Sequence, residues 1–311
     1  MSLKKLNKKA QLQFPFAWVF AIIVGAIIIF IAIYASTRVI NVGEEKVSAE
    51  LSQEFESLLN PLESGPESGS SISIDMPTET QLIFSCSSFT DFGKQEISLK
   101  QKISNKFVST DFSLVSENKY IFSNKTVQGK KFFVFTKPFE FPFKVADLMY
   151  FTSSDESYCF LDAPKNIERE ISNLNQENLF VKDCPSNSKK ICFKSRTGCN
   201  VFVNENLKTV SLEREEVYYE TDALLYAAIF SNNKQDYECN VKRLMKRAEI
   251  LSRIYNEKTN ILANQGCISE VNLLPLINSL NSYNSSDDLT FVKNFADDAE
   301  LSNERARCKL W

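Results

Sequence analysis

The chain has 311 residues, of which 36 are Lys or Arg and 39 are Asp or Glu, and it contains no histidine. The lack of histidine excludes His-based catalytic triads, imidazole metal ligands and the usual side-chain pH switch. Four of the basic residues lie within the first ten positions, which leaves 32 basic against 39 acidic side chains, a net charge of −7, for the rest of the chain. An acidic body argues against a phosphate-binding surface, so we expect no nucleic-acid partner.

An apolar run without charge extends from Phe14 to Ala35. As a helix it would span about 33 Å, enough to cross a hydrocarbon core of about 30 Å. The run is longer than the apolar stretch of a cleaved signal peptide, and Ile33 stands where a cut after Ala35 needs a small side chain. We therefore predict a basic leader over 1–13 and a single transmembrane helix over 14–36.

The charges that flank this run predict its orientation. Four lysines precede the apolar run and only Arg38 follows it closely. Because basic residues favour the cytoplasmic side, we expect a cytoplasmic N-terminus and an extracytoplasmic chain from about residue 40 onward. The sequence thus predicts a single-pass protein of the cell membrane, with the lipid bilayer as a partner.

The segment KKAQLQF, residues 8–14, carries a family resemblance. A short basic leader ending in Lys-Lys-Ala, then Gln11 and an apolar helix, resembles the class III signal peptides of archaeal type IV pilin-like proteins. The resemblance covers only the leader and the apolar helix. It implies cleavage between Ala10 and Gln11 by a prepilin peptidase, and partners among copies of itself or other pilin-like subunits. The chain departs from the family at Pro15, where many pilins carry the glutamate that helps subunits register in a filament.

The next segment is amphipathic. Charged and polar residues surround apolar ones that recur at helical spacing, namely Val47, Leu51, Phe55, Leu58 and Leu59. This pattern predicts a juxtamembrane helix over 37–60, whose apolar stripe could dock on the outer domain or pair with the helix of another copy. The Pro-, Gly- and Ser-rich stretch NPLESGPESGSS then predicts a linker, taken as 61–80.

Residues 81–311 are predicted to form an extracytoplasmic α+β domain. Short β-rich runs separated by turn signals indicate a meandering antiparallel sheet in a β-rich part, 81–220, with a helix at NIEREISNL. Helical patterns dominate 221–311, above all residues 237–262, where the basic face with Arg243 is predicted to be solvated. In FFVFTKPFEFPFKV, Pro138 and Pro142 suit an edge strand or a kinked crossing, and we expect the phenylalanines in the core. The expected fold is therefore a transmembrane helix and amphipathic stem, a disulfide-rich antiparallel β region and a C-terminal helical part.

All eight cysteines lie beyond the predicted span. An even number of cysteines outside the cytosol predicts up to four disulfides, and the lack of close C-x₂-C pairs argues against zinc or iron–sulfur sites. We expect a disulfide-closed local loop in the Cys184–Cys199 region, and disulfides that hold the helical part and the C-terminal tail together. Which cysteine pairs with which is left open. The candidates are Cys86, Cys159, Cys184, Cys192, Cys199, Cys239, Cys267 and Cys308.

The sequence contains no recognisable catalytic motif. Asn124 and Asn284 stand in glycosylation acceptor triplets, but we find no Gly-rich phosphate loop or nucleophile elbow, and we expect neither a cofactor nor enzymatic activity. Two functions remain open. The favoured one is a membrane-anchored extracytoplasmic structural or interaction protein, such as a pilin-like or minor-pilin-like surface subunit or adhesin. The alternative is a signal-anchored extracytoplasmic enzyme or ligand-binding domain.

Overall fold

The computed structural model describes residues 18–36, 71–90, 92–103, 105–212, 215–231 and 233–311. The chain divides into two compact units, Met1–Leu51 and Ser52–Trp311, and each is described by itself. The predicted leader over 1–13, the predicted juxtamembrane helix over 37–60 and the first part of the predicted linker lie outside the described residues.

The described part of the first unit is an apolar helix, Trp18–Ser36. Its 19 residues have a mean hydropathy of 2.8, and at 1.5 Å per residue they extend over about 28 Å. The large apolar side chains are exposed along the helix, up to 71% for Phe30. A helix of membrane-spanning length and composition is thereby confirmed within the predicted range 14–36, and it could serve as an anchor or as a signal sequence.

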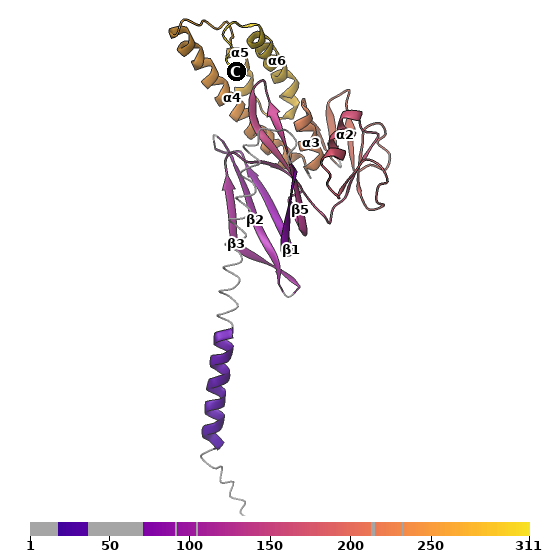
Figure 1. Ribbon diagram of the computed structural model, residues 1–311, viewed down its shortest axis with the longest axis vertical. Coiled ribbons are helices and arrows are strands. Elements are labelled where there is room, and N and C mark those ends of the chain that lie inside the picture. The colour runs from indigo at the N-terminus through magenta and orange to yellow at the C-terminus, as the bar shows by residue number, and fades with distance from the viewer. Residues whose placement is uncertain (1–17, 37–70, 91, 104, 213–214, 232) are drawn as a thin grey trace, which may run out of the picture. The chain divides into compact units, whose positions relative to one another are not determined.

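The second unit opens, in its described part, with a six-stranded sheet (Figure 1). Its strands are β1 (Ser71–Ser87), β2 (Lys94–Ile103), β3 (Lys106–Ser116), β4 (Tyr120–Phe122), β5 (Thr126–Glu140) and β6 (Lys144–Ser153). The spatial order is β3-β2-β1-β5-β6-β4, and every pair is antiparallel except β4 with β6. The meander is present in β1-β2-β3, but β1 also pairs with β5 and is therefore a central strand.

Strand β1 corrects the predicted boundary between linker and domain. It begins at Ser71, so residues 71–80 belong to the sheet and not to the linker predicted over 61–80. Ile74 and Met76 are buried there, and residues 71–75 pair with β5. The Gly- and Ser-rich composition just before the strand concealed a start that depends on this pairing.

The Phe- and Pro-rich segment forms the end of β5 and the turn into β6. Pro138 pairs with β6 on one side only, because the pairing of β1 with β5 reaches no further than Phe135. The prolines thus lie at an edge of the sheet and in a turn, where a missing N–H breaks no ladder. Phe139, Phe141 and Phe143 are buried, as predicted for core residues.

A second six-stranded sheet follows. Its strands are β7 (Tyr158–Leu161), β8 (Leu179–Phe180), β9 (Lys189–Cys192), β10 (Val201–Asn204), β11 (Thr209–Leu212) and β12 (Glu215–Tyr218), in the order β12-β11-β10-β9-β7-β8. The pairs β7–β8, β7–β9 and β9–β10 are parallel, so the predicted antiparallel region is rich in antiparallel pairs but also contains parallel ones. Parallel neighbours need crossover connections, and helix α2 (Lys165–Asn173) lies in the one between β7 and β8.

The C-terminal part is helical, as predicted, with the helices gathered toward one end of β1, β2 and β3 (Figure 1). The elements are α3 (Asp222–Phe230), α4 (Lys234–Asn264), α5 (Leu274–Asn281), the short 3-10 helix η1 (Ser286–Asp288) and α6 (Leu289–Arg305). The side chains of Thr221 and Asn233 cap α3 and α4 by accepting hydrogen bonds from backbone N–H groups in the first turn.

Helix α3 lies at the centre of the largest core. Its sequence DALLYAAIF is apolar on all sides, and Ala223 to Phe230 are all buried, as expected of a helix surrounded by protein. Its Tyr226 and Phe230 make edge-to-face contacts with Phe135 of β5. The hydroxyl of Tyr150 donates to the carbonyl of Ala223 at 2.8 Å. This core joins the first sheet, the second sheet and the helices into one domain.

Candidate functional site

All eight candidate cysteines form disulfides. Cys192 and Cys199 close a short local loop, and Cys267 and Cys308 tie the chain after α4 to the C-terminal tail, as expected for these regions. Cys184 pairs outside the expected local loop, with Cys159. The fourth bond, Cys86–Cys239, joins β1 to α4 over a sequence separation of 153 residues. We call it the β1–α4 disulfide, and Cys192–Cys199 the loop disulfide.

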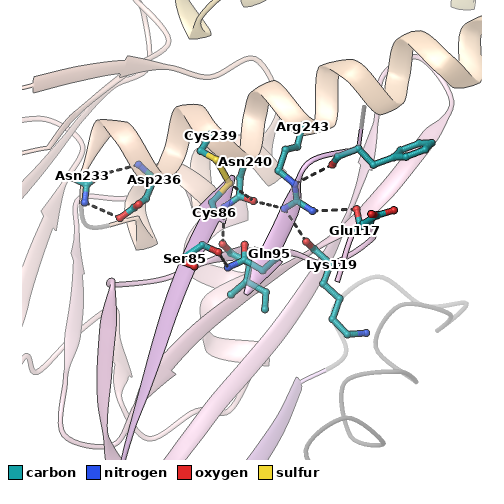
Figure 2. Close-up of a disulfide and its surroundings, with 12 residues drawn as sticks. Ser85, Cys86, Gln95, Glu117, Lys119, Asn233, Asp236, Cys239, Asn240 and Arg243 are labelled. Carbon is teal, nitrogen blue, oxygen red and sulfur yellow. Dashed lines mark hydrogen bonds between the residues drawn. A yellow bond between two sulfur atoms is a disulfide. The ribbon is translucent and has the colours of Figure 1, made fainter. Parts of the chain in front are cut away.

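Next to the β1–α4 disulfide lies a polar cluster that sequence analysis missed (Figure 2). Arg243, predicted to be solvated, is 1% exposed. Its guanidinium donates to the Asn240 side-chain oxygen at 2.9 Å and to the backbone carbonyls of Phe92, Glu117 and Lys119 at 3.1–3.2 Å. The Asn240 amide in turn donates to the carbonyl of Ile121 at 3.0 Å. The cluster therefore fixes the β1–β2 and β3–β4 connections against α4.

The charge of Arg243 is buried without a carboxylate partner in the described part of the chain. Burial lowers its pKa below the ordinary value of 12.5, and the carbonyl dipoles and the ring of Tyr120, 4.7 Å away, replace water around the cation. Gly93 makes room for it, because a Cβ there would lie 2.6 Å from Arg243 Cγ, and its φ of +60° favours glycine. We conclude that Arg243 holds the fold together and is not placed to meet a ligand.

The described residues also contain a surface groove of about 330 Å³. Three segments far apart in the sequence line it, namely the β5–β6 turn, the start of α3 and one face of α6. Its charged lining consists of Lys137, Glu140, Asp222, Lys293, Asp297 and Glu300. Sequence analysis could not find this groove, because its six charges are divided among three segments that lie far apart in the sequence.

The two lysines of the groove are already paired. Lys293 forms an ion pair with Asp297 one helical turn away. Lys137 donates to both carboxylate oxygens of Glu170 at 2.7 Å, and the hydroxyl of Tyr226 donates to Glu170 at 3.1 Å. Burial, and then the charge of Glu170, raise the pKa of Tyr226 far above its ordinary value. Glu170 therefore accepts three hydrogen bonds and neutralises the groove residue Lys137.

The remaining carboxylates give the groove its character. Glu140, Asp222 and Glu300 are exposed and have no ion pair among residues 71–311 that the structure describes. Asp222 lies in the first turn of α3, where the helix dipole favours a negative charge. With its lysines neutralised, the groove presents a net negative surface that attracts cations. It holds no set of three acidic or cysteine side chains placed to bind a metal ion within the described part of the chain.

Comparison with protein-family models, curated proteins and solved structures gives no match.

The remaining predicted residues occupy different surroundings. Ala10 and Gln11, the predicted processing site, lie outside the described residues. Asn284 is exposed, and its amide donates only to the carbonyl of Ser282 within its own turn. Asn124 is half-buried, and its amide nitrogen donates to Glu156 at 2.6 Å. Of the two predicted glycosylation sites, Asn284 is therefore the accessible one.

Proposed function

We propose that the protein is a membrane-anchored extracytoplasmic structural or interaction protein, and that its N-terminus is processed as in type IV pilin-like proteins. The observation that carries the proposal is the division of the chain. One exposed apolar helix stands near the N-terminus, and all four disulfides lie in the domain that follows it. Disulfides of this number persist outside the cytosol, so the helix is best placed to anchor a domain that faces the oxidising side.

The pilin-like part of the proposal is supported by the KKAQ sequence ahead of the apolar helix. Cleavage after Ala10 would remove the basic leader and keep the helix, which would then anchor the domain or pack with other subunits. The departure at Pro15 favours a role as a minor subunit or as a solitary surface protein over that of the main filament subunit.

The test is the N-terminal peptide of the protein isolated from its own membranes. Mass spectrometry is the right method, because an N-terminal glutamine cyclises and blocks chemical sequencing. A mature N-terminus at Gln11 is the expected result. A start at Met1 or Ser2 would leave a plain signal anchor, and a start at Ser36 would make the protein a secreted one without an anchor; either result would overturn the pilin-like proposal.

The acidic groove favours a second candidate function, a ligand-binding domain that takes a cationic group. Three exposed carboxylates that form no ion pair with other described residues line a space of about 330 Å³. If the groove binds cations, spermidine should raise the melting temperature of the full chain, and Asp222→Asn with Glu300→Gln should abolish the rise. Asp298, which is also exposed on α6 but does not line the groove, provides the control variant Asp298→Asn.

A further inference from the structure

One face of helix α4 is covered along its first half and bare along its second. The residues of this face recur at spacings of three, four or seven, so their side chains lie in one row along the helix. In the first half, the Asn240 amide donates to the carbonyl of Ile121 (Figure 2). Arg243 binds the two strand connections, and Arg247 donates to the carbonyl of Val145 at 2.9 Å. The first sheet therefore covers the row as far as Arg247.

The second half of the same row consists of isoleucines that are open to solvent. They are Ile250, Ile254 and Ile261, and we call them the isoleucine stripe. Ile250 is half-buried, whereas Ile254 and Ile261 are 57% and 59% exposed. The stripe extends over about 16 Å of helix. A contiguous exposed apolar row of this kind is typical of an interaction surface.

Further exposed apolar side chains lie beyond both ends of the stripe. After the end of α4, Ile268 is 75% exposed. Toward the start of α4, Arg243 donates to the carbonyl of Phe92 at 3.2 Å in the β1–β2 connection. In this connection Phe92 and Phe89 are 37% and 98% exposed. The stripe therefore lies between an exposed isoleucine at one end and exposed phenylalanines at the other.

We propose that the isoleucine stripe binds the same stripe of a second copy, with the two α4 helices antiparallel about a two-fold axis near Asn256. Ile250 of one copy then faces Ile261 of the other, and the two Ile254 side chains lie next to each other at the axis. Ile268 of each copy approaches the β1–β2 connection of the other. Such a contact uses the same patch on both copies and therefore closes as a dimer.

Charge complementarity favours a second copy as the occupant. Arg253 and Glu257 are exposed, one helical turn apart, on the same flank of the stripe. Across the two-fold axis, Arg253 of each copy lies beside Glu257 of the other, which adds two ion pairs at the rim of the contact. Glu257 forms no ion pair with the described residues. Arg253 uses its Nε for Glu249, and its other N–H groups can serve a partner.

The covered half of the row argues against a parallel pair. The first sheet stands out from α4 at Arg243 and Arg247. Two parallel helices would bring both sheets to the same level, where they would hold the stripes apart. In the antiparallel pair each sheet instead lies near the end of the other copy's α4. The order of covered and bare segments therefore selects the antiparallel arrangement.

Site-directed cross-linking of the full chain in detergent tests the proposal. Because all eight cysteines form disulfides, a single added cysteine is the one thiol that reacts with a short bismaleimide. We expect Ile254→Cys to give a covalent dimer whose fraction rises with protein concentration, as for a small and weak interface. Lys242→Cys, exposed on the same helix but outside the row, should give at least fivefold less dimer. Equal yields from the two variants, or no dimer from Ile254→Cys, would overturn the proposal.

Two further cysteine variants test the direction of the helices. Ile250→Cys alone should give no dimer, because its two copies lie about 16 Å apart along the helix pair. A mixture of Ile250→Cys with Ile261→Cys should give a cross-linked dimer of the two variants. A dimer from Ile250→Cys alone would indicate parallel helices and would contradict the antiparallel pair.

A charge reversal tests the choice of partner. In the Ile254→Cys chain, Glu257→Arg should lower the dimer yield about tenfold, because it places like charges side by side at both Arg253 positions. Glu304→Arg makes the same change at an exposed residue of α6 and should leave the yield unchanged. An unchanged yield for Glu257→Arg would contradict pairing with a second copy in this register. The pairing requires neither N-terminal processing nor the anchor, so it can fail or hold separately from the function proposed above.

Discussion

Replacing Arg243 by methionine should destabilise the domain more than any change of a surface charge. The guanidinium donates to backbone carbonyls of both strand connections and to Asn240, and Arg243 is 1% exposed. A hydrogen bond to a charged group contributes about 1.5–3 kcal/mol, and an abandoned buried acceptor costs about 1–3 kcal/mol. Methionine fills much of the volume of the arginine side chain, and carbonyls near the surface, such as that of Glu117, can bind water instead. We therefore expect the free energy of unfolding to fall by about 3–5 kcal/mol.

The assay is thermal unfolding of the full chain in detergent, followed by near-ultraviolet circular dichroism under non-reducing conditions. For a domain of this size the loss corresponds to a fall in melting temperature of about 10 °C. The matched control is Lys242→Met on the same helix, because Lys242 is exposed and forms no ion pair with the described residues. An exposed charge of this kind contributes at most about 1 kcal/mol. Equal shifts for the two variants would refute the view that Arg243 anchors the two strand connections.

Three further outcomes are expected. Replacing both cysteines of the β1–α4 disulfide by serine should cost about 5 kcal/mol of stability, and the same change at the loop disulfide about 2 kcal/mol. The reason is that the entropy regained by the unfolded chain grows with the length of the loop that the disulfide closes. A lower melting temperature for the loop-disulfide variant than for the β1–α4 variant would contradict this account. Burial alone would raise the pKa of Glu249, but hydrogen bonds from Lys246 and Arg253 hold that pKa below the ordinary value of 4.5. For Glu238, burial raises the pKa above 4.5. The stability that ionised Glu249 contributes should therefore be lost as the pH falls below about 4.5, so the melting-temperature difference between the parent and Glu249→Gln should shrink from about pH 5 to pH 3. The stability that protonated Glu238 contributes should be lost as the pH rises above about 4.5, so the difference for Glu238→Gln should change from about pH 4 to pH 6. In a host that glycosylates this triplet, peptide mass spectrometry should find sugar on Asn284 and none on Asn124, whose amide nitrogen is engaged with a carboxylate.

The elements that follow from local sequence pattern were predictable. The apolar helix Trp18–Ser36, helix α4 and the burial of the Phe-rich turn all depend on composition and period within one short window. The participation of all eight cysteines in disulfides followed from their even number and their position after the apolar run. Such features need no knowledge of the rest of the chain.

Features that depend on distant partners were not predictable. Strand β1 is central because it pairs with β5, some fifty residues later in the chain. Strand β3 has only a weak alternation of apolar and polar residues, and it is stabilised as a strand by its pairing with β2. Arg243 lies in a run of basic residues that is typical of a solvated helix face, and only the carbonyls of two distant connections show why this one is buried. The acidic groove likewise exists only where three segments meet.

The β1–α4 disulfide also determines how the domain would respond to mechanical load. A pull between an N-terminal anchor and the C-terminus enters the described domain at Ser71 and reaches Cys86 within one strand. It then crosses the sulfur bridge into α4 and leaves through the Cys267–Cys308 bond. The segments enclosed by the two bridges, 87–238 and 268–307, therefore stay outside the line of tension. Most of the polypeptide, including the second sheet and α3, would be unable to extend under a force that does not break covalent bonds. A domain built in this way yields little length when it is stretched.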